Sequence, residues 1–187
     1  MIPRKLSLLD KSKITSHLQN LQGEERRLRF GGSVSDDYIA DYVERSFKDN
    51  SKWFGVDHID GYLVAVCHVA IMDNDAELGC SVDKDYRNQG LAQLMFDRAV
   101  TWLRSKGIHH VFMHCLSENG AMKHIARKNE MTVVSFSGET DAEVDLEPAT
   151  PFTPLVDAYA DRMAVYDMLL KNNLRLMRTM FKVTDHT

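Results

Sequence analysis

Residues 76–103, AELGCSVDKDYRNQGLAQLMFDRAVTWL, decide the fold, because two elements and the turn between them can be read from this stretch. AELGCSV is an apolar run typical of a strand, and DKDYRNQG follows as a polar turn. From Leu91 onward, apolar residues recur every three or four positions, which predicts an amphipathic helix that ends near Gly107. The side chains expected to face the core are Leu91, Leu94, Met95, Ala99, Trp102 and Leu103.

The turn at 87–92 lies between this strand and this helix. A helix N-terminus exposes backbone N–H groups that lack partners, and the helix dipole adds positive potential there. Gly90 and the small Ala92 let oxygen atoms approach the backbone closely, so the turn suits an anion such as a diphosphate. Alone, so short a motif equally fits a tight strand-to-helix connection. It lacks the Gly-Lys-Ser/Thr of the nucleotide P-loop and two glycines of the dinucleotide fingerprint.

Strands and helices continue on both sides of this stretch. Before it, we expect a short strand at 5–9, helices at 10–23 and 35–47, and a hairpin with strands at 53–58 and 62–72. After it, we expect a strand at 108–116, a short helix capped by Asn119 or Ser117, and strands at 131–136 and 141–146. This order predicts an α/β (α+β) fold, in which helices flank both faces of a mixed sheet.

Pro151 and Pro154 border the last part of the sequence, where the pattern becomes purely helical. We expect residues 1–150 to form one domain and residues 151–187 to form a helical extension. The apolar stripe of this helix is more typical of packing, against the core or in a homodimer, than of a ligand site. Its residues are Leu155, Tyr159, Met163, Tyr166, Met168 and Leu169.

Composition limits the class of protein. The 187 residues are 44% hydrophobic and 27% charged, as in an ordinary globular domain. The net charge of −4 provides no cationic field for nucleic acid or anionic lipid, and the most hydrophobic segment, 62–72, is too short to span a bilayer. The three cysteines lack CxxC spacing and indicate buried thiols of a reducing, cytoplasmic protein. His109, His110 and His114 complete no ligand set, so no metal is expected.

The motif YRNQGLAQLMFDRAVTWLRSKGI at 86–108 and the later helix SENGAMKHIARKNEM at 117–131 resemble the GNAT superfamily of acyl-CoA-dependent N-acyltransferases. The resemblance covers roughly residues 5–136 and implies a mostly antiparallel GNAT-like sheet, with acetyl-CoA as co-substrate. It implies that the strand pairs with the pantetheine arm and that the turn holds the pyrophosphate. The positions carried over are the backbone of Cys80, Ser81 and Val82 for pantetheine, Arg87, Asn88, Gln89, Gly90, Leu91 and Ala92 for pyrophosphate, and Asn119 beside the cofactor.

Within the superfamily, RRLRFGG at 26–32 together with the AE that opens the strand resembles the bacterial protein lysine acetyltransferases. That resemblance implies that Glu77 is the general base. An acceptor ammonium with a pKa near 10.4 must lose a proton before its nitrogen can attack a thioester, so a nearby carboxylate suits the reaction. The alternative is that Glu77 is a solvated glutamate at a strand edge.

The later helix departs from the family at two places. Many relatives use a tyrosine there to protonate the leaving thiolate, and the matching position here is Ala126. A thiolate leaves without such an acid when water and amides are near, and Ser117, His124 or Tyr86 are substitutes. The family's Gly-Phe at the helix end is Glu130-Met131 here, so we expect Asn129 to take the left-handed turn.

Together these features predict transfer of an acetyl group from acetyl-CoA to a primary amine by direct attack. The oxyanion would be held by backbone N–H near Val82. The acceptor stays open between protein lysine, polyamine and other small amines, and Asp36, Asp37 and Asp41 would attract a cationic amine. The alternative function is an acyl-CoA-binding sensor or interaction module that has lost turnover, which the missing tyrosine supports.

Overall fold

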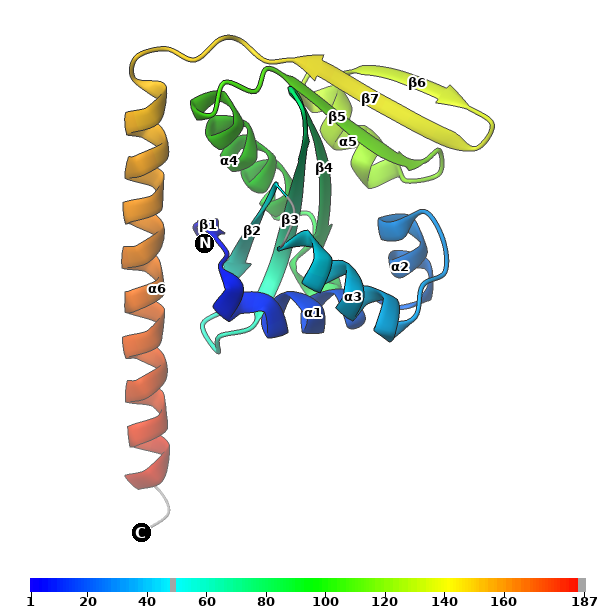
Figure 1. The fold of residues 1–187 in the computed structure, drawn as a ribbon. Helices are drawn as coiled ribbons and strands as arrows, with labels where there is room; N and C mark the ends of the chain where they lie inside the picture. The colour runs from blue at the N-terminus through cyan, green and yellow to red at the C-terminus, as the bar shows by residue number, and fades with distance from the viewer. Residues whose placement is uncertain (48–49, 185–187) are drawn as a thin grey trace.

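The computed structural model describes residues 1–47 and 50–184, with the backbone alone for 181–184. Figure 1 shows the elements in chain order. The N-terminal part contains β1 (Arg4–Lys5), the 3-10 helix η1 (Leu8–Asp10), α1 (Lys11–Gln19), α2 (Gly23–Phe30), α3 (Asp36–Ser46), β2 (Ser51–Asp57) and β3 (Leu63–Met72). The C-terminal part contains β4 (Asp75–Val82), the 3-10 helix η2 (Lys84–Tyr86), α4 (Leu91–Ser105), β5 (His110–Leu116), α5 (Gly120–Lys128), β6 (Thr132–Phe136), β7 (Glu139–Asp145) and α6 (Thr153–Thr184).

Within the described residues, the strands form a single sheet in the order β1-β2-β3-β4-β5-β7-β6. Neighbouring strands are antiparallel except β4 and β5, which run parallel. β4 pairs with β3 along its whole length, but it pairs with β5 only from Asp75 to Glu77. Beyond Glu77 the two strands separate, as Figure 1 shows, and the sheet opens between them.

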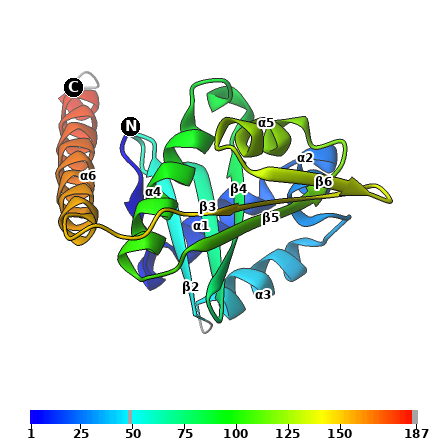
Figure 2. The same ribbon diagram turned by 90° about the horizontal axis from the view of Figure 1, so that it is seen from above.

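Helices cover the two faces of the sheet, and the expected α/β (α+β) class is confirmed (Figure 2). α4 and α5 pack on one face over a core that includes Phe54, Leu78, Met95, Leu103 and Val111. α1 and α3 pack on the other face over Ile14, Leu18, Ile39, Val43 and Trp53. Because the central strand β3 has both faces covered, it is an almost unbroken apolar run rather than an alternating one.

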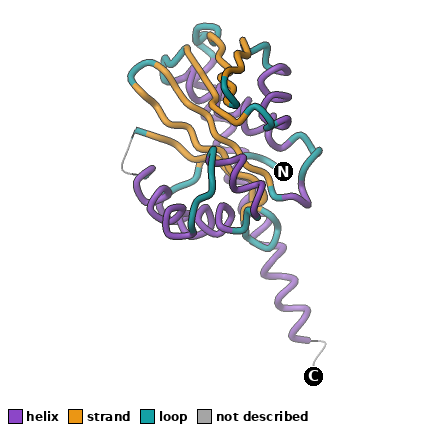
Figure 3. The backbone as a smooth tube through the Cα atoms, turned by 90° about the vertical axis from the view of Figure 1, so that its right-hand side faces the viewer, coloured by secondary structure: helices purple, strands orange, loops and turns teal. Residues whose placement is uncertain are grey.

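α6 stands beside the body and extends past the other elements at its C-terminal end (Figure 3). Ion pairs attach it to the body. Asp157 lies 2.6 Å from the Arg98 guanidinium and 3.0 Å from Lys5, and Asp161 also pairs with both cations. The Arg98 side chain is only 6% exposed, so these contacts lie inside the molecule. Among the described helices, none combines the length and the apolar character needed to cross a bilayer.

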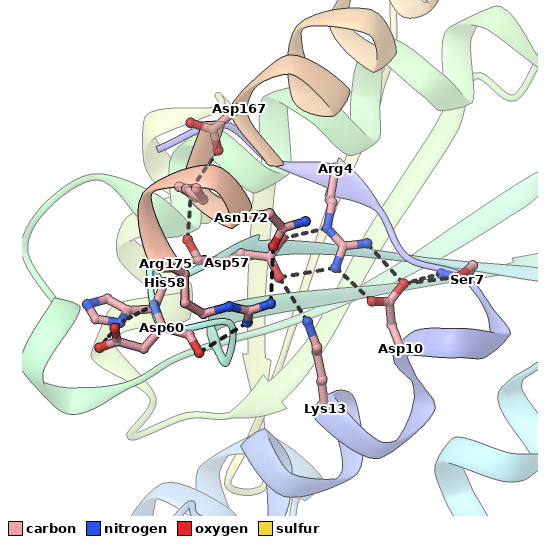
Figure 4. A network of polar contacts seen from close by, with 11 residues as sticks. Arg4, Ser7, Asp10, Lys13, Asp57, His58, Asp60, Asp167, Asn172 and Arg175 are labelled. Atoms are coloured by element: carbon pink, nitrogen blue, oxygen red, sulfur yellow. Dashed lines mark hydrogen bonds and ion pairs between the residues drawn. The ribbon is translucent and has the colours of Figure 1, made fainter. Parts of the chain in front are cut away.

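Arg4 connects the N-terminus with the sheet through two carboxylates (Figure 4). Its guanidinium lies 2.7 Å from Asp10 and 2.5 Å from Asp57. Burial alone would raise the pKa of Asp10, but hydrogen bonds led by the one from Arg4 hold that pKa below its usual value. α6 reaches the same cluster because Lys171 donates to the backbone oxygen of Asp57 at 2.8 Å.

Two local predictions for the N-terminal part need correction. The strand expected at 5–9 ends at Lys5, because the Ser7 hydroxyl accepts from the Leu9 N–H while the Asp10 carboxylate accepts from the Ser7 N–H, and this capping box turns the chain into η1. The sequence pattern also predicts no helix between 23 and 35, where α2 forms. The Ser35 cap of α3 has the expected form, with its hydroxyl accepting from the Tyr38 N–H.

Three further predictions differ in detail. Leu94 was expected in the core but is 38% exposed, because it lies at the edge of the α4 stripe. Asn129 does not take the left-handed turn. Its side chain is held by Gln93 and by the Ile125 carbonyl, and Glu130 takes that conformation with φ 56°. The last strand, β7, starts two residues earlier than expected and lies between β5 and β6.

Candidate functional site

The opening between β4 and β5 leaves part of the β4 backbone without a strand partner. The Asp83 N–H donates to the Val64 carbonyl of β3, and backbone groups of an antiparallel strand alternate in direction. The backbone N–H groups of Val82 and Cys80 therefore point toward the opening, while the N–H group of Ser81 points toward β3. Of the three residues predicted to pair with pantetheine, Cys80 and Val82 offer backbone groups to the opening, and Ser81 does not.

Glu77 lies at the closed end of this opening, on the last pair that joins β4 to β5. Its cross-strand neighbours are Ala70 and Phe112, and its side chain is half-buried. No ion pair to Glu77 occurs within the described residues. The pKa of His114 is raised, first by its hydrogen bond to Asp141 and to a smaller extent by the charge of Glu77. His114 and Glu77 therefore interact electrostatically on one face of the sheet.

The turn from Arg87 to Gly90 has the conformation that an anion site needs. Asn88 and Gly90 have positive φ values of 59° and 76°, and Gly90 is the N-terminal cap of α4. No side chain caps this helix, so the N–H groups of its first turn are not used by a capping side chain. Arg87 to Gly90 are exposed, whereas Leu91 is buried in the core and anchors the helix. The geometry fits the predicted diphosphate.

α2, which the sequence pattern did not predict, bridges the wide end of the opening. At one end, Glu25 pairs with Arg87 at 2.6 Å. At the other end, the Asn119 side chain donates to the Leu28 carbonyl at 3.2 Å and accepts from the Met122 N–H, which caps α5. Two residues predicted to contact the cofactor, Arg87 and Asn119, are thus both engaged by α2. The two acidic residues at 24 and 25 before RRLRF were the available signal for this helix.

Arg29 of α2 reaches the β4 backbone next to Glu77. Its guanidinium donates to the Gly79 carbonyl and to the Tyr42 hydroxyl, both at 3.3 Å, and no carboxylate among the described residues pairs with it. The same tyrosine hydroxyl lies 2.8 Å from Nδ1 of His68. Burial and the nearby Arg29 charge lower the pKa of His68 to about 3, so its imidazole is neutral at physiological pH. Arg29 is therefore a permanent positive charge beside the β4 backbone on the Glu77 side of the sheet.

The thiol of Cys80 lies on the opposite face from Glu77, under α4. It is 2.7 Å from the thiol of Cys67, its cross-strand partner, and all three cysteines, including Cys115, are free. A hydrogen bond with Cys80 and burial raise the pKa of Cys67, so this thiol stays protonated. Only Cys67 and Cys115 are fully buried, since Cys80 is half-buried.

The residues suggested as substitutes for the missing tyrosine are mostly engaged elsewhere. Ala126, at the position of the missing tyrosine, is buried. Of the substitutes, Ser117 donates to the Glu139 carbonyl at 2.8 Å, and the Tyr86 hydroxyl lies 3.1 Å from the Tyr62 hydroxyl. His124 is exposed on α5. Among these described residues, the hydroxyls of Ser117 and Tyr86 thus already take part in other hydrogen bonds.

Two further features lie near this site. A cavity of about 710 Å³ opens beside η2, between α1 and the turn before β3; Glu25 and Lys84 line it, but Glu77 does not. Within the described part of the chain, no three His, Cys, Asp or Glu side chains are placed to hold a metal ion.

The sequence profile described as the acetyltransferase (GNAT) family matches residues 18–129, which include α2, the opening and the turn at 87–92. The chain belongs to the GNAT acetyltransferase family. Acetyl-CoA is the acyl donor of GNAT enzymes, and the open backbone of β4 and the uncapped N-terminus of α4 suit such a group. A search of curated proteins finds no significant match.

Solved GNAT structures share the fold at low sequence identity. The GNAT domain of S. lividans PAT is 18% identical, with a TM-score of 0.66 over 77% of this chain and 89% of that one. The ribosomal-protein-S18-alanine N-acetyltransferase from Escherichia coli is 15% identical, with a TM-score of 0.61 over 80% and 96%. A ribosomal L7/L12 alpha-N-protein acetyltransferase solved with coenzyme A is 13% identical, with a TM-score of 0.65 over 79% and 94%.

Proposed function

We propose that this GNAT protein transfers an acetyl group from acetyl-CoA to a primary amine, with Glu77 as the general base. The observation that carries the proposal is the end of the β4 and β5 pairing at Glu77. The half-buried Glu77 carboxylate thus lies at the closed end of the opening, three residues before Cys80, whose backbone N–H suits a pantetheine amide.

Two groups of residues would hold the donor. The backbone N–H groups of Cys80 and Val82 would pair with the pantetheine arm, and the latter would also stabilise the oxyanion. The turn Arg87–Ala92 would bind the pyrophosphate through its N–H groups and through the Arg87 guanidinium. The guanidinium would then leave its ion pair with Glu25 and bind phosphate oxygens instead. Asn119, fixed by α2 and α5, would border this site.

The reaction needs no covalent enzyme intermediate. Glu77, directly or through one water, takes a proton from the acceptor ammonium. The resulting amine forms a bond to the thioester carbonyl carbon, and the nitrogen then gives its second proton to solvent. The bond from that carbon to sulfur breaks, and coenzyme A leaves as a thiolate that solvent protonates. A thiol with a pKa near 8.5 is a good enough leaving group for this step without a protein acid.

The face of the sheet that carries Glu77 supports a cationic acceptor. Along β7, side chains alternate strictly, so that Glu139, Asp141 and Glu143 are exposed on this face. Glu143 is the register neighbour of Phe112, which is the register neighbour of Glu77. The negative potential of this surface favours approach of a protonated amine, such as a protein lysine, a protein N-terminus or a polyamine.

The test measures free thiol released from acetyl-CoA near pH 8 with polyamines, amino acids, aminoglycosides, lysine peptides and peptides with a free N-terminus. Glu77→Gln should lower kcat by about 10²–10⁴-fold, with acetyl-CoA affinity nearly unchanged. Asp75→Asn is the matched control, because it removes the same charge from the same strand and the same face. Equal losses in both variants, or an unaltered pH profile in Glu77→Gln, would exclude Glu77 as the base.

A sensor that binds acyl-CoA without turnover is the second candidate. The buried Ala126 at the tyrosine position and the engaged hydroxyls of Ser117 and Tyr86 favour it. Acetyl-CoA binding in calorimetry, combined with no amine-dependent thiol release across the panel, would support the sensor and contradict the enzyme.

A further inference from the structure

The outward side of α6 is an exposed apolar stripe. Its side chains are between 36% and 69% exposed, although they belong to the residue types that are usually buried. No other described residue covers this stripe, and Figure 1 shows α6 at the margin of the molecule. The stripe consists of Leu155, Val156, Tyr159, Met163, Tyr166, Leu169, Leu170, Leu176, Met177 and Met180.

α6 is attached to the body by the opposite side. Asp157, Asp161 and Lys171 make ion pairs or hydrogen bonds with the body, and Ala164 is buried against it. An amphipathic helix that docks on its own domain normally turns its apolar face inward. Here the polar face is inward and the apolar face is outward, so a partner is needed for the apolar face.

The spacing of the stripe is that of a coiled coil. Its central positions recur at alternating intervals of three and four residues, which is the a and d pattern of a heptad repeat. The a positions are Val156, Met163, Leu170 and Met177, and the d positions are Tyr159, Tyr166, Asn173 and Met180. Asp157, Asp161, Ala164 and Lys171 fall on b and f, away from this seam, so pairing through the seam leaves their contacts with the body in place.

We propose that the stripe is the interface with a second copy of this chain, in which two α6 helices form a parallel, in-register coiled coil. A sustained heptad repeat is self-complementary, whereas a lipid surface requires no heptad spacing. The repeat runs for about 37 Å of helix. Pairing over that length covers on the order of 800 Å² per chain, the area typical of a stable dimer.

Charge and polar positions favour the parallel arrangement. In a parallel pair, each g residue faces the e residue five positions later on the partner helix. Arg162, at g, then faces Asp167, which also pairs with Lys171 of its own helix at 2.5 Å, and Leu169 faces Leu174. Arg162 is exposed and has no ion pair within the described residues. Asn173 would face its own copy within the seam, which is the arrangement that fixes register in parallel dimers.

Sedimentation equilibrium of the full chain tests the interface. The wild type should sediment at twice the 21.4 kDa chain mass at micromolar concentration. The double variant Tyr166→Glu, Leu170→Glu should associate at least about 100-fold more weakly, because it buries charges in the seam. Val165→Glu is the matched control and should remain dimeric, since Val165 is exposed on the same helix but lies at position c.

Helix content and thermal unfolding of each variant establish that it is folded. A wild type that is monomeric at every concentration would overturn the proposal, as would a dimer that survives the double variant. The proposal would also fail if a monomeric wild type bound anionic vesicles through the same residues.

Cysteine cross-linking tests the orientation. Val156→Cys lies at one end of the seam, so two copies of position 156 meet only in a parallel pair, and mild oxidation should then give a disulfide-linked dimer. Ala158→Cys, at position c, should not cross-link, and neither should the wild type. A Val156→Cys variant that is dimeric by sedimentation but does not cross-link would overturn the parallel arrangement.

Discussion

Gly90 shows how a single residue shapes the turn that we propose as the pyrophosphate site of this GNAT protein. Its φ of 76° places it in the left-handed region, where a side chain is strained. A Cβ at this position would meet no atom within 4 Å, so the requirement for glycine comes from the backbone and not from packing. The same backbone conformation directs the first N–H groups of α4 toward the proposed pyrophosphate position.

Replacing Gly90 with alanine should lower the free energy of unfolding by about 1–2 kcal/mol and weaken acetyl-CoA binding, because the turn must either strain or change shape. Urea unfolding and calorimetric titration measure the two effects. Gly120→Ala is the control, since Gly120 also has open space but no positive φ. Equal effects of the two substitutions would mean that the left-handed conformation of Gly90 does not matter.

At the scale of elements, α2 lies across the opening between β4 and β5 and holds residues from both sides of it. The Glu25 carboxylate pairs with the Arg87 guanidinium, so it would compete with the pyrophosphate for this group. Burial alone would raise the pKa of Glu25, but hydrogen bonds from Gln22 and Arg87 outweigh it, so that the pKa is lowered and the carboxylate stays charged.

Glu25→Gln should therefore tighten acetyl-CoA binding by roughly two- to fivefold, because it removes a partly exposed ion pair worth about 0.5–1 kcal/mol that competes for Arg87. Arg87→Ala should weaken binding instead. Calorimetry at low salt compares the two variants with the wild type. Weaker binding in Glu25→Gln would show that the ion pair supports the site rather than competing with it.

Most elements could be predicted from the sequence, because strong local signals specify them. AELGCSVDKDYRNQGLA gave a strand, a turn and a helix, and Ser35 and Asn119 cap their helices as expected. The contacts of α2 could not be predicted. They depend on Glu25 meeting Arg87 and on Leu28 meeting Asn119, which are tertiary contacts between distant parts of the chain.

At the scale of the whole molecule, α6 depends on a few ion pairs around Arg98, because its apolar side faces away from the body. Burial alone would raise the pKa of Asp157, but hydrogen bonds from Lys5 and Arg98 outweigh it and lower the pKa. A carboxyl whose pKa is lower when folded contributes stability above its unfolded pKa, near 3.9, and loses that contribution as the pH falls through the folded value.

Asp157→Asn should lower the free energy of unfolding at pH 7 by about 1–3 kcal/mol, because Arg98 is left with Asp161 alone. The loss of stability below about pH 4 should also become shallower than in the wild type. Urea unfolding across pH, at one fixed chain concentration, measures both effects. Asp37→Asn, on the surface of α3, is the control and should change stability by less than about 0.5 kcal/mol. An unchanged acid profile in Asp157→Asn would contradict this role.

Hydrogen exchange of the full chain with and without acetyl-CoA tests the central claim most directly. If the donor binds in the opening between β4 and β5, saturating acetyl-CoA should slow amide exchange in peptides that cover 78–82 and 88–93. Exchange along 153–180 should not change. Unchanged exchange in both of the first two segments, at a concentration where calorimetry shows binding, would place acetyl-CoA elsewhere and contradict the account.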